Sequence, residues 1–196
     1  MLWSAASDLT SIWSGNLQRA ITSYGADSVL SFNEPDGCCW SCGNSCMNVS
    51  SAVSAYKQWV QPLAGKVKLG APAVTNGVGE GVGISYMSYF MGNCTGCQVD
   101  FIPIHWYGSV LDPGSFEAYV QSFYTKFNKP IWITEFGTTS GTDAQIVAFL
   151  KQALPWLDSQ SYVQRYAYFM DSNTGAPYLL NPNNTMNDIG VEYNSG

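Results

Sequence analysis

Two glutamates each follow a strand-like run. The stretch "LSFNEPDG" spans residues 30–37 and reaches Glu34 through Asn33, and "IWITEFG" spans residues 131–137 and reaches Glu135. A strand gains nothing for its own stability from a carboxylate at its end. We interpret two such endings in matching contexts as carboxyl groups that serve one site, although a cap or a surface salt bridge explains either glutamate alone about as well.

A pair of carboxyl groups suits the hydrolysis of glycosidic bonds. One carboxyl group protonates the leaving oxygen, and the other attacks the anomeric carbon or activates a water molecule that does so. The acid must keep its proton near neutral pH, which requires surroundings that favour its neutral form. Asn33 could hydrogen-bond the sugar 2-hydroxyl, and Pro35 ends the strand ladder because it has no N–H, which helps to fix Glu34 at the rim.

A third polar cluster, "HWY", follows the strand-like run at residues 99–104. The simple interpretation of His105 is a histidine satisfied at the rim of the fold. In this context we expect it to contact a sugar or to orient Glu135, and we expect Tyr107 to donate its phenol to the nucleophilic carboxylate. A serine hydrolase is not indicated, because the chain contains no "GxSxG" motif.

The elements that must position these residues alternate between strands and amphipathic helices. Apolar spacing predicts helices, with Gly25 stopping the first and Thr142 and Gln145 forming a capping box for the last. The predicted helices span residues 10–25, 50–63, 83–92, 115–127 and 142–157. The predicted strands span residues 1–3, 27–32, 66–74, 99–107, 129–134 and 164–170.

These segments make six strand–helix units, the last without a convincing helix, in a single predicted domain over residues 1–196. Such alternation implies parallel strands covered by helices, either in an open doubly wound sheet or in a closed (β/α)₈ barrel. No glycine-rich phosphate fingerprint follows a strand, which weakens the first architecture. Catalytic residues of a barrel lie at the carboxyl ends of strands, where Glu34, His105 and Glu135 are found. We therefore predict the barrel, although it needs eight strands.

Composition limits the partners of the chain. Of 196 residues, 46% are hydrophobic and 11% are charged, and the net charge of −6 with only 8 Lys and Arg argues against nucleic acid. No apolar run is long enough to span a membrane. We expect most of the 7 Trp, 12 Tyr and 9 Phe to lie in the hydrophobic core. Flat aromatic rings also stack on the apolar faces of sugars, so some of them could line a groove that binds a glycan.

The 6 cysteines indicate the compartment. Four lie in "CCWSCGNSC" and two in "CTGC", and zinc is one interpretation of such density. Irregular spacing and a single histidine favour disulfides and an oxidising compartment instead, with Cys94 bridged to Cys97. Sequons at Asn48, Asn183 and, more weakly, Asn93 fit a secreted protein, although no signal peptide follows Met1. We expect no metal and no cofactor.

The motifs together resemble glycoside hydrolase family 128, the endo-β-1,3-glucanase-like proteins of fungi and bacteria. The stretches that carry the resemblance are "FNEPD", "LGAPAVTN", "HWY" and "WITEFG", supported by "MLW", "CTGC", "LPWLD" and "RYAYFM". The "NEP" triplet alone is shared widely among the barrels of glycoside hydrolase clan A, whereas the full set is specific and runs through nearly the whole chain.

The resemblance implies a (β/α)₈ barrel and hydrolysis with retention of configuration. It implies that Glu34 is the acid/base and Glu135 the nucleophile, with carboxyl groups about 5–5.5 Å apart. It also places "MLW" at the family's third strand, so that the first two strand–helix units have no counterpart here. The candidate substrate contacts are Trp3, Asn33, Asn76, His105 and Tyr107.

The predicted function is that of a secreted, monomeric endo-β-1,3-glucan hydrolase located outside the cell or in the cell wall. Its expected partner is a β-1,3-glucan polysaccharide or oligosaccharide. The alternatives are a non-catalytic β-glucan-binding protein that keeps the cleft, or an inactive fragment of the same barrel. Retention of both glutamates favours the enzyme, and the two absent units favour the alternatives.

Overall fold

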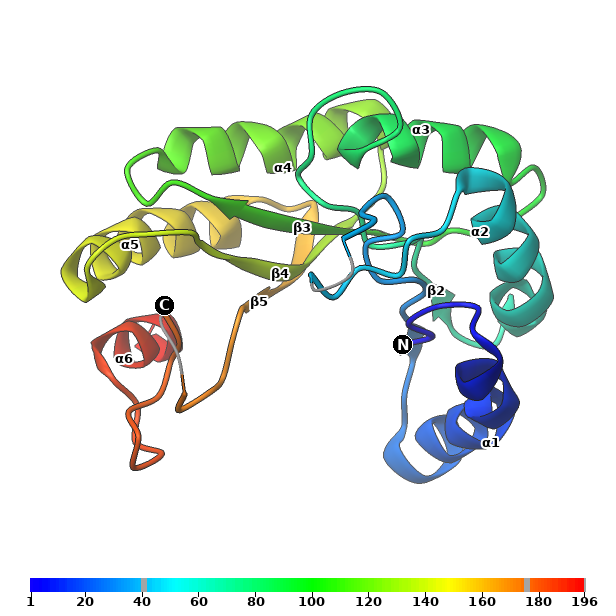
Figure 1. Ribbon diagram of the computed structural model, residues 1–196, viewed down its shortest axis with the longest axis horizontal. Helices are drawn as coiled ribbons and strands as arrows, with labels where there is room; N and C mark the ends of the chain where they lie inside the picture. The colour runs from blue at the N-terminus through cyan, green and yellow to red at the C-terminus, as the bar shows by residue number, and fades with distance from the viewer. Residues whose placement is uncertain (40–41, 175–176, 196) are drawn as a thin grey trace. The chain divides into compact units, whose positions relative to one another are not determined.

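The computed structural model describes residues 1–39, 42–174 and 177–195 (Figure 1). It contains two compact units, Met1–Pro103 and Ile104–Gly196. The prediction of a single catalytic domain over the whole chain stays a prediction. None of the helices in the described residues is long and apolar enough to cross a membrane.

The first unit alternates helices with very short parallel strands. Its elements are α1 (Ser7–Tyr24), β1 (Ser28–Val29), α2 (Val49–Ala55) with a π-helical turn (Tyr56–Val60) and a 3₁₀ turn (Gln61–Leu63), β2 (Lys68–Leu69) and α3 (Gly83–Asn93). The helix α1 ends at Gly25, whose φ of 67° is the left-handed conformation that glycine adopts without strain. The sequence prediction of that stop is confirmed.

Parallel pairing in the first unit extends beyond its named strands. The N-terminal segment joins β1, because Leu2 donates its N–H to the carbonyl of Leu30 (3.0 Å) and Asn33 donates to the carbonyl of Trp3 (2.9 Å). On the other side, β1 pairs with β2, and Gly70 bridges to Phe101 in the same direction. The predicted strands at 27–32 and 66–74 are thus present as the short parallel pair β1 and β2, extended by isolated bridges, whereas the predicted strand at 1–3 is hydrogen-bonded to the chain after β1 without forming a strand.

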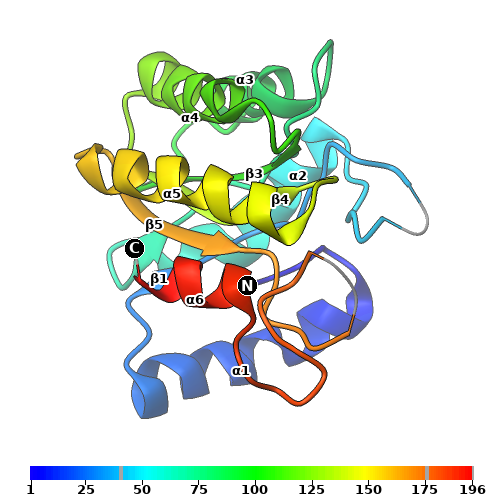
Figure 2. The same ribbon diagram turned by 90° about the vertical axis from the view of Figure 1, so that its left-hand side faces the viewer.

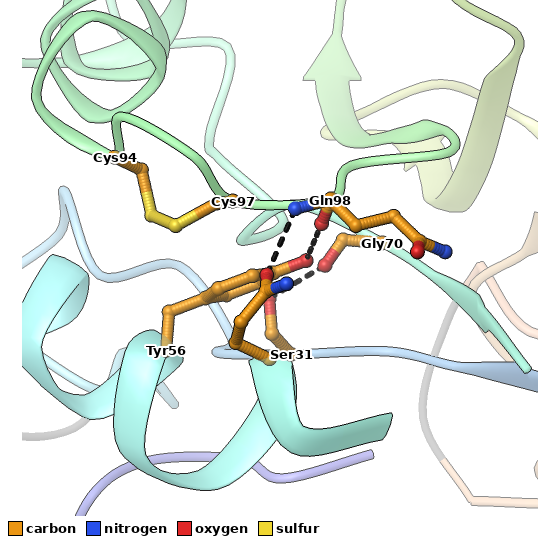
Figure 3. The surroundings of a disulfide bond; sticks show 7 residues. Ser31, Tyr56, Gly70, Cys94, Cys97 and Gln98 are labelled. Atoms are coloured by element: carbon orange, nitrogen blue, oxygen red, sulfur yellow. Dashed lines mark hydrogen bonds between the residues drawn. A yellow bond between two sulfur atoms is a disulfide. The ribbon is translucent and has the colours of Figure 1, made fainter. Parts of the chain in front are cut away.

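A disulfide closes the turn that follows α3 (Figure 3). Cys94 and Cys97 are bridged, and the next residue, Gln98, is held through both its N–H and its carbonyl. Its N–H donates to the side chain of Gln61 (2.8 Å), and its carbonyl accepts from the phenol of the buried Tyr56 (2.8 Å). The bridge therefore stiffens the point at which the chain leaves α3 for the next strand.

The second unit is a three-stranded parallel arrangement with helices. Strand β3 (Ile102–Gly108) begins at the end of the first unit and is followed by α4 (Pro113–Phe127), β4 (Ile131–Thr138), α5 (Asp143–Ser159), β5 (Val163–Tyr168) and α6 (Asp188–Ser195). The sheet order is β3-β4-β5, and β4 and β5 are parallel. The helices α4 and α5 run beside the sheet, and α6 lies near β5 (Figures 1 and 2).

An aromatic cluster fills the space between the sheet and its helices. Trp106 of β3 contacts Phe116 of α4 and Phe149 of α5, with ring centroids 4.9 and 5.7 Å apart. Phe116 also stacks on Phe136 of β4 at 5.3 Å. Since side chains alternate along a strand, Trp106 on the helix side sends its neighbours in "HWY" to the other face of the sheet.

The secondary structure agrees with most of the sequence predictions. The prediction that a strand ends before Glu135 is wrong, because β4 continues to Thr138 and Glu135 lies inside it. The capping box of Thr142 and Gln145 is present at the start of α5, confirming that prediction. Sequence reasoning missed α6, because its eight residues include Gly190 and carry too short an apolar pattern to stand out. The parallel α/β class is confirmed, and closure into a (β/α)₈ barrel stays a prediction.

Candidate active site

In the first unit, Glu34 lies where the chain leaves the parallel segments. Its N–H donates to the carbonyl of Ala73 (2.7 Å), and its own carbonyl accepts from Gly37 (3.1 Å) in a tight turn. The residue is 9% exposed, which places a carboxyl group in a largely dry environment. A strand-end prediction made from apolar patterning is therefore met in local structure.

The backbone of Glu34 is strained. Its φ is +43°, a left-handed conformation that residues with a Cβ adopt at a cost on the order of 1–3 kcal/mol. Such conformations persist where the surroundings fix them, and they concentrate at functional sites. Here the two flanking backbone hydrogen bonds hold the conformation, and the result is a carboxyl group aimed differently from the alternating side chains of the segment before it.

Two asparagine amides act near Glu34 in the chain, one on the loop and one on the carboxyl group. The Asn33 side chain is buried and donates Nδ2–H to the carbonyl of Gly43 (3.0 Å), so at least part of its capacity serves the loop. Its predicted contact with a sugar 2-hydroxyl stays a prediction. Asn44 donates its Nδ2–H to Oε2 of Glu34. Sequence reasoning assigned no role to Asn44.

Asp36 fixes the loop that carries Asn76. Its carboxylate accepts from the N–H (3.1 and 3.2 Å) and hydroxyl (2.7 Å) of Thr75 and from the N–H of Gly83 (2.8 Å). Burial, assisted by the charge of Asp36, raises the pKa of the Tyr86 phenol well above its ordinary value. The loop after β2, with the half-buried Asn76 in it, is thus tied to the residue two positions after Glu34.

Trp3 joins this region through its backbone, because its carbonyl accepts the N–H of Asn33 (2.9 Å). It is 38% exposed and lines an apolar hollow of about 260 Å³ together with residues of α1 that include Leu9 and Trp13. Its exposed ring face is compatible with stacking on a sugar. The predicted role of Trp3 as a substrate contact stays a prediction.

In the second unit, Glu135 is held between two side chains of the neighbouring strand. Tyr107 donates its phenol to Oε2 of Glu135 at 2.7 Å, and Nδ1 of His105 is 3.6 Å from the same oxygen. The other imidazole nitrogen, Nε2, lies 2.9 Å from the hydroxyl of Thr134. The His105 side chain is fully buried, whereas that of Glu135 is 24% exposed. The carboxylate therefore has a buried neighbour and is itself accessible to solvent.

A β-bulge makes this arrangement possible. Between Ile133 and Phe136 strand β4 advances three residues, whereas β5 advances two between Tyr166 and Tyr168. In a regular strand, consecutive side chains point to opposite faces, and the extra residue of a bulge breaks that alternation. Hence the consecutive residues at 134 and 135 both reach His105, with no signal in the sequence for the bulge.

The sequence-predicted site residues are divided between the two units. The first unit holds Trp3, Asn33, Glu34 and Asn76, and the second holds His105, Tyr107 and Glu135. Within the second unit, the expected donation from Tyr107 and the expected proximity of His105 to Glu135 are present. The separation between the carboxyl groups of Glu34 and Glu135 stays a prediction.

Three supporting residues were missed by sequence reasoning. They are Asp36, Asn44 and Thr134. Asp36 and Thr134 lie inside the motifs "FNEPD" and "WITEFG", so their proximity to the glutamates was a usable signal. Asn44 had none, because its contact depends on how the cysteine loop folds back.

The cysteines are all paired. The bridges are Cys38–Cys46, Cys39–Cys42 and Cys94–Cys97, with no free cysteine in the described chain. The prediction of disulfides is confirmed, and the pairing of the four loop cysteines, which the sequence left open, is now defined.

Comparisons with known proteins place the chain in a class. The family model described as "Glycosyl hydrolase catalytic core" matches residues 1–193. The chain is also 34% identical over 154 residues to the alkali-sensitive linkage protein 1 of Schizosaccharomyces pombe, a match that covers 74% of this chain. That match spans only 27% of the length of the curated relative.

Solved structures give the same class. A curdlan-specific exo-β-1,3-glucanase of glycoside hydrolase family 128 from Blastomyces gilchristii, in complex with glucose, is 32% identical with a TM-score of 0.84, covering 98% of this chain and 79% of the other. An endo-β-1,3-glucanase of that family from Amycolatopsis mediterranei, in complex with laminarihexaose, is 31% identical with a TM-score of 0.78, covering 100% and 80%.

The class that these features define is that of the glycoside hydrolases. The chain belongs to the glycosyl hydrolase catalytic-core family, and its resemblance to glycoside hydrolase family 128 is confirmed.

Proposed function

We propose that this protein is a secreted endo-β-1,3-glucan hydrolase that acts by a retaining double displacement. The observation that carries the proposal is the carboxylate of Glu135 at the bulge inside β4, with the phenol of Tyr107 at 2.7 Å and the imidazole of His105 at 3.6 Å. The structural relatives that bind glucose or laminarihexaose support a β-1,3-glucan as substrate.

In the first step Glu135 attacks the anomeric carbon while Glu34 gives its proton to the leaving glycosidic oxygen. The phenol of Tyr107 donates to Oε2 of Glu135 and so fixes the orientation of the carboxylate. It also favours the charged form of that group, because a hydrogen bond to the charged form stabilises it. In the second step Glu34, now a carboxylate, takes a proton from water as that water attacks the glycosyl-enzyme. Two inversions give net retention.

The proposal includes a closed (β/α)₈ arrangement that brings Glu34 and Glu135 to about 5–5.5 Å, the separation of retaining enzymes. It also includes a monomeric protein outside the cell or in the cell wall. The three disulfides support an oxidising compartment. A separation of about 6.5–9.5 Å would favour an inverting mechanism instead.

The test is the hydrolysis of laminarin and of laminarihexaose by the purified chain. An endo-acting enzyme releases products of several lengths at early times, whereas an exo-acting one releases a single short product. Proton NMR of the fresh product reports its anomeric configuration, which we expect to be β. Binding of laminarin without any hydrolysis would contradict the proposal and favour the non-catalytic β-glucan-binding protein.

A further inference from the structure

Residues 42–47, the described part of the chain that returns from the cysteine motif, are bonded to the segment that presents Glu34. Hydrogen bonds join the two segments. Asn33 Nδ2 donates to the carbonyl of Gly43 (3.0 Å), and the N–H of Ser45 donates to the carbonyl of Asn33 (2.9 Å). The N–H of Met47 donates to the carbonyl of Pro35 (2.9 Å). The residues on both sides of Glu34 are thus bonded to the returning loop.

The loop places one amide directly on the carboxyl group. Asn44 donates Nδ2–H to Oε2 of Glu34, and its Oδ1 accepts the N–H of Cys39 at 3.4 Å. The two contacts define opposite ends of the amide, so its donor end faces the glutamate. Gly37 is required beside it, because a Cβ at that position would lie 2.5 Å from Cγ of Asn44.

Two disulfides restrain the same loop. Cys38 is bridged to Cys46, which closes the loop at both ends, and Cys39 is bridged to Cys42 inside it. A cross-link removes conformations from a short segment that has little core of its own. A functional side chain needs that kind of support, because a reacting group must be held close to its productive geometry.

We propose that Asn44 is a positioning residue for Glu34, held in place by the disulfide-closed loop. The proposal rests on the proposed function for the role of Glu34 as acid/base. When Glu34 gives up its proton in the first step, negative charge develops on its carboxyl group. The N–H of Asn44 stabilises that charge, because hydrogen bonds to ionised groups are stronger than those between neutral groups. The amide also fixes the rotation of the carboxyl group.

A direct test compares two substrates. Asn44→Ala and the isosteric Asn44→Asp both remove the donor. For laminarin, whose leaving group needs protonation, we expect kcat to fall by about 10- to 100-fold, the range for losing one hydrogen bond to a charged group. For an aryl β-laminarioligosaccharide with an activated leaving group, the first step needs no proton and its rate should change by less than about 2-fold.

A matched control is Asn48→Ala. Asn48 lies just after the loop and caps α2, accepting the N–H of Ser51 at 2.9 Å. Loss of this cap lowers the melting temperature without touching Glu34. We expect the ratio of the two activities to stay at the wild-type value in this variant. The double variant Cys38→Ser, Cys46→Ser should instead change the ratio in the same direction as Asn44→Ala.

A second readout does not depend on activity. The chain has five glutamates, so carbon-13 labelling of their carboxyl groups gives a simple spectrum in which Glu34→Gln identifies the signal of Glu34. In Asn44→Ala its titration midpoint should move upward by about one pH unit relative to wild type, a tenfold change in proton affinity. The midpoint should move further in Asn44→Asp, where two carboxyl groups adjoin, and not at all in Asn48→Ala.

The outcomes separate this proposal from the proposed function. If the wild type cleaves no β-1,3-glucan, the proposed function fails, and the titration alone decides whether Asn44 controls the carboxyl group. If the enzyme is active and the activity ratio is unchanged in both folded Asn44 variants, the proposal is overturned. An unchanged titration midpoint in both variants overturns it whether or not the protein is an enzyme.

Discussion

The two glutamates are supported in different ways. Glu34 lies in a strained left-handed turn, is almost fully buried, and is contacted by an amide from a loop closed by disulfides. Glu135 lies in a bulged strand, is partly exposed, and is contacted by a phenol and an imidazole from the next strand of the same sheet. One carboxyl group thus depends on covalent loop closure, and the other depends on sheet pairing.

The difference matches the two chemical tasks that we propose for these residues. An acid/base must alternate between protonated and charged forms, and a buried carboxyl group that accepts from the Asn44 amide can do both. A nucleophile must stay charged until it attacks, and hydrogen bonding from a phenol favours the charged form. The comparison makes definite predictions about which changes affect each carboxyl group.

The largest expected effect is the loss of Glu135, the proposed nucleophile. Glu135→Gln forms no glycosyl-enzyme, so cleavage of laminarin and of an activated aryl glycoside should both fall by roughly 10⁴-fold or more. Glu34→Ala should lower laminarin hydrolysis by about 10²–10⁴-fold but leave the first step with the activated substrate intact.

Added azide separates the two roles further, because it needs no general base. It should restore turnover of the activated substrate by Glu34→Ala, with retained configuration at the anomeric carbon. Rescue of Glu135→Gln or Glu135→Ala instead, with an inverted product, would show that the assigned roles are reversed. Wild-type rates in both variants would place the active site elsewhere.

The next effect concerns the phenol on Glu135. Tyr107→Phe removes one hydrogen bond to a carboxylate, and kcat/KM should fall by about 10- to 100-fold for both substrates, since attack by Glu135 accompanies the departure of either leaving group. Without the donor, the nucleophile protonates more readily as the pH falls. The acidic limb of the pH–rate profile should therefore move to higher pH, and an unmoved limb would leave Tyr107 with a purely structural role.

A smaller effect tests the backbone at the two positions. At Glu34 the φ of +43° disfavours any residue with a Cβ, so Glu34→Gly should be more stable than Glu34→Ala by about 1 kcal/mol. At Glu135, inside β4, glycine only adds backbone entropy to the unfolded chain. Glu135→Gly should therefore be less stable than Glu135→Ala by about 0.5–1 kcal/mol. Chemical denaturation of the four variants measures both differences in the free energy of unfolding. If glycine were the more stable, or the less stable, variant at both positions, the predicted contrast would be wrong.

The smallest effect provides the control for Tyr107. The hydroxyl of Tyr162 is buried, and the described residues give it no hydrogen-bond partner, while its ring stacks on Tyr124 with centroids 4.1 Å apart. Burial raises the pKa of the Tyr162 phenol, consistent with a poorly solvated group. Tyr162→Phe should leave kcat/KM unchanged and stability within about 0.5 kcal/mol of wild type or slightly higher. A large loss of activity would show that removing any phenol from this unit is harmful.

Local chemistry made much of this protein predictable. The spacing of apolar residues predicted most of the helices and the parallel strand segments, because an element that buries one face repeats apolar residues at its own structural period. Turn and cap residues such as Gly25 and Thr142 act on their own neighbours and were predictable for that reason. The short helix α6 was missed because its packing against the second unit, rather than its own pattern, stabilises it.

The sequence by itself determined that His105 and Tyr107 accompany Glu135 and that the cysteines pair. Tertiary structure alone decided how each carboxyl group is held. The bulge before Phe136, the left-handed turn at Glu34 and the contact from Asn44 each depend on segments that meet only after the chain has folded. The physical reason is distance along the chain. Propensity and periodicity act within a few residues, whereas a hydrogen bond between two segments that meet only in the folded chain leaves no local pattern in the sequence of either segment.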